Sequence, residues 1–308
     1  MRRRVASAVV VAAVAAVAVV AIVDAVRPLR PEPAAPLDAE AAAQLAELGV
    51  AGTLVYADAD CGLHAMSLPG LTPAQVPGGI DVGCEISVSP DGRHVAGAGA
   101  RWSPDGAQYA ICRGTRVDVV DAAGGPARGT FTGCAPAFRP DGMVTFARDG
   151  AILEARPAQI VVPRSELERA ARTHPNAPEL PIEELRVRDL AWTSRFDVVA
   201  LVEARYRLGL PEFQPTIAGF RYGRLLWRRS YLGDFDRLVV SSRGEVLPEP
   251  PPRPFPFLTG RLRLAGPFDW SPDGQRLAVA TRANVFVVDL ATERHVRIPV
   301  TARDLAWR

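Results

Sequence analysis

A five-residue motif recurs along this chain and constrains its fold more than any other feature. Trp270-Ser271-Pro272-Asp273-Gly274 is followed by two apolar runs, and the passage opened by Trp102-Ser103-Pro104-Asp105-Gly106 aligns with it almost residue for residue. Ser, Pro and Asp suit the first three positions of a type I turn, and Gly takes the left-handed conformation that follows. Each copy therefore predicts a β-hairpin. The predicted turn residues are Ser89, Pro90, Asp91, Gly92, Ser103, Pro104, Asp105, Gly106, Pro140, Asp141, Gly142, Ser271, Pro272, Asp273 and Gly274.

Repetition of such hairpins predicts an all-β fold of the propeller class. The residue before each turn falls at positions 102, 138, 192, about 235, 270 and 307, with a mean spacing of about 40 residues, and WD-type propeller units run about 40 to 45 residues. Six blades are expected from these markers. The turn at 89–92 comes very soon before the next copy, and the Pro-rich run 248–256 makes the fifth unit irregular. Five or seven blades therefore remain open.

The two ends of the domain are expected to complete one blade. The segment Ala302–Trp307 looks like the first strand of a unit without its hairpin partner, whereas Thr53–Ala57 and Gly62–Ser67 lack a strand before them. Pairing them closes the ring and removes free sheet edges. The predicted propeller domain is 50–308. A helical insertion is expected at about 163–185, with Ser165 as N-cap and Glu168 in the capping-box position.

The N-terminal region predicts a membrane anchor. Residues 1–4 form a basic cytoplasmic stub, and 5–26 form a transmembrane signal-anchor, because the apolar run is long enough to cross a bilayer. The positive-inside rule then places the C-terminal domain outside the cytoplasm, in a single-pass cell-membrane protein. Residues 27–49 predict a Pro-rich linker and a short helix that Asp38 caps and Gly49 ends. A cleaved signal peptide is the alternative, with Val23 and Ala25 at its cleavage site.

These turn motifs, with an aromatic residue before Ser-Pro-Asp-Gly and an apolar strand after it, resemble the WD-like repeats of the TolB propeller family. The resemblance covers roughly 50–308 and is clearest at 102–121 and 266–290. It implies a six-bladed propeller in the bacterial envelope, where relatives are protein interaction platforms. TolB carries an α/β domain before its propeller, and this chain does not, so the role in the Tol system is not carried over. Prolyl-oligopeptidase-like peptidases share the repeat, but the hydrolase domain that they need is absent.

All four cysteines are predicted to lie on the translocated side. An even number in an oxidising compartment favours disulfides, and the sequence has no close C-x₂-C pair that would indicate zinc. Cys61 and Cys112 lie near the second hairpin turn of their units, while Cys84 and Cys134 precede a Pro-Asp-Gly turn. The pairs Cys61 with Cys84 and Cys112 with Cys134 are therefore favoured. Pairing of Cys84 with Cys112 remains open.

No catalytic, cofactor-binding or metal-binding residues are expected. The four histidines are far apart, and no nucleophile elbow, P-loop or H-E-x-x-H motif occurs. One aspartate per turn is explained by turn chemistry, so no Ca²⁺ or acid-base cluster is inferred from the turns. A net charge of +2 gives no reason to expect nucleic acid as a partner. The tryptophans at the shared repeat position are expected to pack between blades: Trp102, Trp192, Trp270 and Trp307.

The sequence therefore predicts a protein-interaction or sensing module whose partners are unknown envelope proteins. The loops 173–185 and 248–257 are the first candidates for partner contacts. The stretch Tyr222–Arg229 is expected to be a strand with one wet face, and the alternative is a contact patch for anions. A propeller that binds or hydrolyses a glycan, peptide or small ligand at its central channel is the second hypothesis. An acidic or histidine cluster at a channel mouth would favour it, and an apolar, neutral rim would favour the first.

Overall fold

A computed structural model describes residues 37–308 except 81, 157, 173–180, 207–213, 231–234, 250–265 and 282. Residues 36–308 form one compact unit. The predicted stub, the anchor and most of the linker lie outside the described residues, as do 173–180 and 250–257 of the two loops proposed for partner contacts. Within the described part of the chain, no helix is long and apolar enough to cross a membrane.

The described strands form seven sheets, numbered here in the order in which their inner strands meet. Sheet one is β25 (Asp304–Trp307), β1 (Gly52–Ala57), β2 (Leu63–Leu68) and β3 (Thr72–Pro73). Sheet two is β5 (Ile86–Val88), β6 (His94–Gly97) and β4 (Gly78–Ile80). Sheet three is β7 (Arg101–Trp102), β8 (Gln108–Arg113), β9 (Arg116–Asp121) and β10 (Gly129–Thr132).

The remaining sheets follow the same order from the inner strand outward. Sheet four is β11 (Cys134–Phe138), β12 (Val144–Arg148), β13 (Ala151–Glu154) and β14 (Ile160–Val162). Sheet five is β15 (Ile182–Trp192), β16 (Val198–Tyr206), β17 (Gln214–Arg221) and β18 (Arg224–Ser230). Sheet six has β19 (Arg237–Val240) and β20 (Val246–Glu249) among the described residues. Sheet seven is β21 (Phe268–Trp270), β22 (Arg276–Ala280), β23 (Val285–Asp289) and β24 (His295–Ile298).

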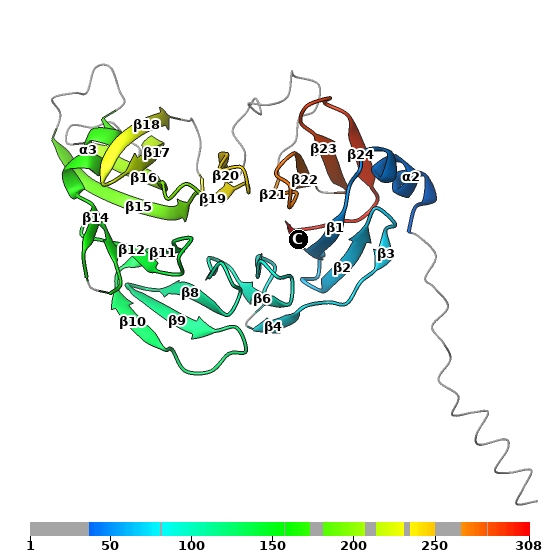
Figure 1. The fold of residues 1–308 in the computed structure, drawn as a ribbon, viewed down its shortest axis with the longest axis horizontal. Helices are drawn as coiled ribbons and strands as arrows, with labels where there is room; N and C mark the ends of the chain where they lie inside the picture. Colours follow the sequence, from blue (N-terminus) through cyan, green and yellow to red (C-terminus); the bar gives the residue numbers. More distant parts are fainter. Residues whose placement is uncertain are drawn as a thin grey trace, which may run out of the picture. The chain divides into compact units, whose positions relative to one another are not determined.

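The inner strands of these sheets contact one another in a closed ring. β25 contacts β5, and the contacts continue through β7, β11, β15, β19 and β21 back to β25. The sheets accordingly follow one another around a centre (Figure 1). Four-stranded antiparallel sheets arranged in this way form a β-propeller. The described residues contain seven sheets, so the expected count of six blades is corrected by one.

Sheet two is the unit that the repeat spacing missed. Its inner strands β5 and β6 flank the turn 89–92, and its third strand, β4, comes from the chain before them and pairs with β6 in parallel. The next inner strand, β7, then begins four residues after β6 ends. Because the third strand is borrowed from the preceding segment, this blade occupies an unusually short stretch of sequence.

The predicted closure of the ring is confirmed. β25 pairs antiparallel with β1, and Leu54 lies opposite Trp307. The Trp307 side chain is buried, and its Nε1 donates a hydrogen bond to the Ala51 carbonyl at 3.0 Å. Sheet one therefore consists of strands from both ends of the domain.

The core lies in the interfaces between neighbouring sheets. One cluster joins Leu54 of β1 and Leu305 of β25 with Ala278 of β22, and the helix α2 (Ala39–Glu47) adds Leu45 to it. As predicted, Asp38 caps this helix, because its carboxylate accepts hydrogen bonds from the Glu40 and Ala41 N–H groups, each at 3.0 Å.

The insertion contains the expected helix, but the N-terminus of this helix differs from the prediction. α3 (Arg164–Ala171) has Pro163 as its N-cap and no side-chain capping bond. The expected cap, Ser165, lies inside the helix, because the helix starts two residues earlier than expected, directly after the extended backbone of Pro163. Glu168 accepts a hydrogen bond from the Arg164 side chain at 2.8 Å instead. Residues 182–185, assigned to the insertion from sequence, belong to β15.

The Ser-Pro-Asp-Gly turns are held by the same three bonds. In the turn at 103–106, the Ser103 hydroxyl donates to the Asp105 carboxylate at 2.6 Å, the Ala107 N–H donates to it at 3.1 Å, and the Gly106 N–H donates to the Ser103 carbonyl at 2.9 Å. Gly106 has φ +71°, which a side chain would strain. The turns at 89–92 and 271–274 repeat this arrangement.

We predict that Trp307→Ala lowers the free energy of unfolding by about 3–5 kcal/mol, because it empties a buried site at the closure of the ring. Urea unfolding followed by circular dichroism measures the change. Trp227→Ala is the control, since this side chain is 37% exposed and should cost less than half as much. Equal costs would contradict a central role for the closure.

We predict that the contribution of Asp105 to stability declines in acid. The Ser103 hydroxyl and the Ala107 N–H hold the pKa of Asp105 below its usual value. A carboxyl with a lowered folded pKa stabilises above its unfolded pKa of about 3.9 and loses that contribution as the pH falls through the folded value. The stability difference between wild type and Asp105→Asn should therefore shrink below about pH 4. Asp149→Asn, at a side chain 91% exposed, serves as control; a gap that is constant with pH would refute the prediction.

Candidate functional site

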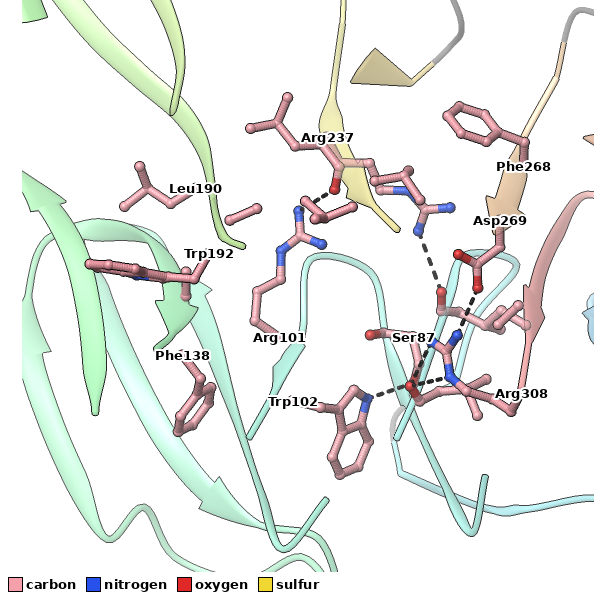
Figure 2. A pocket seen from close by; sticks show the side chains of 18 of the residues that line it. Ser87, Arg101, Trp102, Phe138, Leu190, Trp192, Arg237, Phe268, Asp269 and Arg308 are labelled. Atoms are coloured by element: carbon pink, nitrogen blue, oxygen red, sulfur yellow. Dashed lines mark hydrogen bonds and ion pairs between the residues drawn. The ribbon is translucent and has the colours of Figure 1, made fainter. Parts of the chain in front are cut away.

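The seven inner strands enclose a central channel that contains two cavities. The first, of about 260 Å³, lies at the C-terminal ends of these strands and receives residues from every sheet. Figure 2 shows this cavity, with the side chains of Arg101, Arg237 and Arg308 among those around it. The second, of about 660 Å³, lies at the ends where the strands begin.

Two arginines separate the cavities. Arg101 and Arg237 line both of them, together with Ser87. Their guanidinium groups reach across the channel, and Figure 2 shows that of Arg101 directed toward β19. The channel is therefore divided by charged side chains near its middle.

Arg101 connects three sheets. From β7 it forms an ion pair with Asp189 on β15, and its Nη2 donates to the Leu238 carbonyl on β19 at 3.4 Å. Asp189 also accepts the Leu238 N–H at 2.6 Å. Sheets three, five and six are tied together by these bonds, although sheet four lies between the first two in the ring.

Arg237 forms the second connection. It pairs with Glu249 in its own sheet and with Asp304 on β25, where the Nη2–Oδ1 distance is 2.8 Å. Its Nη1 also donates to the Ile86 carbonyl on β5 at 3.5 Å. Sheets six, one and two are joined in this way, across sheet seven.

The carboxylates of this network share a second role. Each accepts the backbone N–H of the next inner strand around the ring. The bonds are Ile86 N–H to Asp304 at 2.7 Å, Leu238 N–H to Asp189 at 2.6 Å, Phe268 N–H to Glu249 at 2.9 Å and Trp307 N–H to Asp269 at 3.0 Å. Buried N–H groups must find an acceptor, and an inner strand has no neighbouring strand on the channel side. The carboxylates provide that acceptor.

The charges in the channel largely balance. Arg308 pairs with Asp269 at 2.8 Å, so each of the three arginines at the first cavity has a carboxylate partner. Burial raises the pKa of Asp189 and of Asp304, and the paired arginines and backbone N–H groups oppose that rise. Among the described residues, no group of three His, Cys, Asp or Glu side chains is placed to hold a metal ion. The described charged groups of the central channel therefore bind mainly to one another.

The second, larger cavity is bordered by side chains of both charges. Glu85, Asp236, Arg188 and Arg303 lie at its rim, and Arg188 is 3.6 Å from Asp236. This rim is neither an acidic or histidine cluster nor an apolar, neutral surface. The charge at the channel mouth therefore favours neither the protein-interaction hypothesis nor the hypothesis of a ligand or substrate in the channel.

Two disulfides lie beside this end of the channel. The structure joins Cys61 with Cys84 and Cys112 with Cys134, the two pairs that the sequence favoured, with Cα–Cα distances of 4.5 and 5.2 Å. The first links sheet one to the chain entering sheet two, and the second links β8 of sheet three to β11 of sheet four. Such disulfides indicate an oxidising compartment.

The repeated tryptophans pack where the sequence placed them. Trp102, Trp192 and Trp270 each donate from Nε1 to the preceding sheet, to Ser87 O at 3.0 Å, Thr145 Oγ1 at 2.9 Å and Val239 O at 3.4 Å. One polar pair was missed: His64 Nε2 lies 2.7 Å from the Asp58 carboxylate across the turn between β1 and β2. Their separation of six residues across a hairpin was the available signal.

Exposed apolar side chains gather on sheets four and five. Of the seven large hydrophobic residues exposed in the described chain, five belong to these sheets and their turns. They are Ile160 (58% exposed), Phe196 (47%), Tyr222 (97%), Leu226 (50%) and Trp227 (37%), and they are called here the apolar surface. The stretch read as a strand with a wet face is β18 and its preceding turn, and nearly every residue of that strand is exposed.

Comparisons with known proteins give distant likenesses of fold. No family model matches the chain, and no curated protein matches it. A crystal structure of a eukaryotic initiation factor aligns with a TM-score of 0.29 and 12% identity, covering 82% of this chain and 75% of that one. A crystal structure of a mitotic checkpoint complex aligns with a TM-score of 0.30 and 14% identity, covering 78% and 56%. These values carry no inference about function, and the propeller fold rests on the order of the sheets.

We predict that Arg101→Met costs about 3–5 kcal/mol of unfolding free energy, because it leaves Asp189 buried without its cation. Adding Asp189→Asn to this variant should recover a large part of the lost unfolding free energy, since the amide oxygen can still accept the Leu238 N–H. Chemical denaturation measures all three proteins. Arg93→Met is the matched control, at a side chain 81% exposed, and should change stability by less than about 0.5 kcal/mol. An Arg101→Met variant as stable as the control would show that the connection is not structural.

Proposed function

We propose that this chain is a membrane-anchored, extracytoplasmic β-propeller that binds another protein of the bacterial cell envelope. The observation that carries the proposal is the concentration of exposed apolar side chains on two adjoining sheets. Apolar side chains grouped on a protein surface mark interaction sites, whereas singly scattered ones do not. The resemblance to TolB-like repeats and the two disulfides support the envelope as its location.

Three members of the apolar surface, Ile160, Phe196 and Tyr222, come from the junction of sheets four and five, whereas Trp227 covers Gly219 on the other face of sheet five. A Cβ on Gly223, in the turn after Tyr222, would lie 2.7 Å from the Val161 carbonyl, so this turn of sheet five touches β14 beside Ile160. Phe196 is also tied to sheet four, because the Arg139 guanidinium lies 5.9 Å from the centre of its ring. Side chains from both sheets can therefore contact one partner.

This surface is also held in place by contacts beneath it. The Trp227 indole covers Gly219 so closely that a Cβ there would lie 2.4 Å from the ring. The N–H of Leu225 donates to the Glu166 carboxylate of α3 at 2.8 Å, and Arg228 donates to the Arg169 carbonyl at 2.7 Å. A surface ordered before binding loses little conformational entropy when a partner arrives.

Arginines surround the aromatic residues. Arg224, Arg228 and Arg229 are exposed on β18, and the Arg229 guanidinium lies 5.7 Å from the centre of the Trp227 ring. Aromatic residues and arginine are the types enriched where binding energy concentrates in protein interfaces. This composition favours a protein partner with an acidic rim around an apolar centre.

The alternative, a ligand bound or hydrolysed in the central channel, has less support. Arg101 and Arg237 cross the channel, and their charges are already bound by carboxylates. A substrate in this position would have to displace bonds that hold the sheets together. Anchoring through 5–26 remains part of the proposal, since those residues lie outside the described chain.

Site-specific photo-cross-linking in cells of the source organism tests the proposal. We predict that p-benzoylphenylalanine at position 222 of the full chain gives one discrete adduct with an envelope protein, and that Leu226→Ser reduces its yield at least fivefold. The same probe at position 60 is the control, because Asp60 is exposed in the turn between β1 and β2 of sheet one, across the ring from sheets four and five. No adduct at 222, or equal adducts at both positions, would refute the apolar surface as the docking site.

A further inference from the structure

A groove between sheets three and four has a different character from the channel. Its volume is about 390 Å³, and it lies where the turns after β9, β11 and β13 come together. Its lining includes Val119, Phe131, Met143 and Val144, together with Arg128 and Arg156. Sites for small ligands and side chains are typically about 300–1,000 Å³, mostly apolar, with a few polar groups. This groove fits that description.

The apolar part of the groove is rigidly supported. Phe131 on β10 stacks on Phe146 of β12, with ring centres 5.6 Å apart and planes inclined by 21°. Phe146 is buried in the interface between the two sheets, together with Val119 and Val144. The floor therefore belongs to the core that joins the sheets.

The two arginines of the groove differ in their partners. Arg128 donates from Nε to the Asp121 carboxylate at 2.6 Å. Arg156 is exposed, and no acidic side chain among the residues that the structure describes forms an ion pair with it. In the channel, by contrast, Arg101, Arg237 and Arg308 all have carboxylate partners. Within the described residues, Arg156 is thus a cation without an acidic partner at the edge of an apolar groove.

The Arg156 and Phe131 side chains meet above Gly129. A Cβ at Gly129 would lie 3.3 Å from the Phe131 ring and 3.8 Å from Arg156 Nη2. On the opposite side of the groove, a Cβ at Gly142 would meet nothing within 4 Å. A ligand can therefore contact the ring and the guanidinium at once, with open space beside it.

We propose that this groove binds a short peptide segment in which an apolar side chain stands next to a carboxylate. The apolar side chain packs on Phe131 and Met143, and the carboxylate accepts charge-assisted hydrogen bonds from Arg156. The small volume suits one or two side chains. This inference rests on the proposed function, because it names the chemistry of a protein partner, but it uses a different surface.

Fluorescence anisotropy with the full chain in mild detergent tests the groove. The probes are fluorescein-labelled Gly-Ser-Leu-Phe-Asp-amide and the same peptide with Asn in place of Asp. The wild type should bind the Asp peptide about tenfold more tightly than the Asn peptide. Arg156→Gln should remove that difference and leave binding of the Asn peptide unchanged. Met143→Ser should weaken binding of both peptides equally.

Arg148→Gln is the matched control, since Arg148 lies on the same sheet at the opposite end and pairs only loosely with Asp149, at 3.8 Å. It should behave as wild type. Equal binding of the two peptides, or an unchanged preference in Arg156→Gln, would overturn the proposal. Binding of decanoate, measured by calorimetry, to a chain that binds neither peptide would also overturn it, by making the occupant a fatty acid. A cross-link at position 222 that persists alongside these failures would leave the proposed function standing and remove only the groove.

Discussion

At four of the seven junctions between sheets, a carboxylate accepts the backbone N–H of the next inner strand, and the centre of the ring depends on these bonds. An inner strand has a sheet partner on one edge only, and its other edge faces the channel, where a buried N–H without an acceptor is costly. Asp304, Asp189, Glu249 and Asp269 supply the acceptor. A buried carboxylate in turn needs a cation, which explains the arginines that cross the channel. The charged centre is thus a consequence of closing the ring.

Local chemistry made much of the fold predictable. Ser-Pro-Asp-Gly turns, the Asp38 cap and the strand β25 that completes sheet one could all be read from short stretches of sequence. Sheet two could not, because β4 pairs in parallel with β6 and shortens the repeat. The turn at 241–244 also lacks Pro and Asp, although its Gly244 N–H donates to the Ser241 carbonyl as in the other turns. The ion pairs of the central channel could not be predicted from the sequence, since Arg101 and Asp189 are brought together only when the ring closes.

The distribution of polar and apolar groups separates scaffold from binding surface. In the channel, the charged groups pair with one another, so replacing them should lower the free energy of unfolding. On sheets four and five, aromatic side chains and arginines are supported from beneath and face outward. The groove beside Phe131 combines an apolar floor with an arginine that has no ion-pair partner in the described chain. Binding is therefore better placed on the outside of the blades than along their common axis.

The pairing of β25 with β1 also sets the order in which the domain can be assembled. Leu54 and Trp307 lie opposite each other, although 307 − 54 = 253 residues separate them in the chain. During synthesis β1 waits with an open edge until nearly all other strands have been made, and contacts of such long range slow folding. The disulfides span only 23 and 22 residues. They can secure the first four sheets long before β25 arrives, which protects a nascent chain whose first blade is the last to be finished.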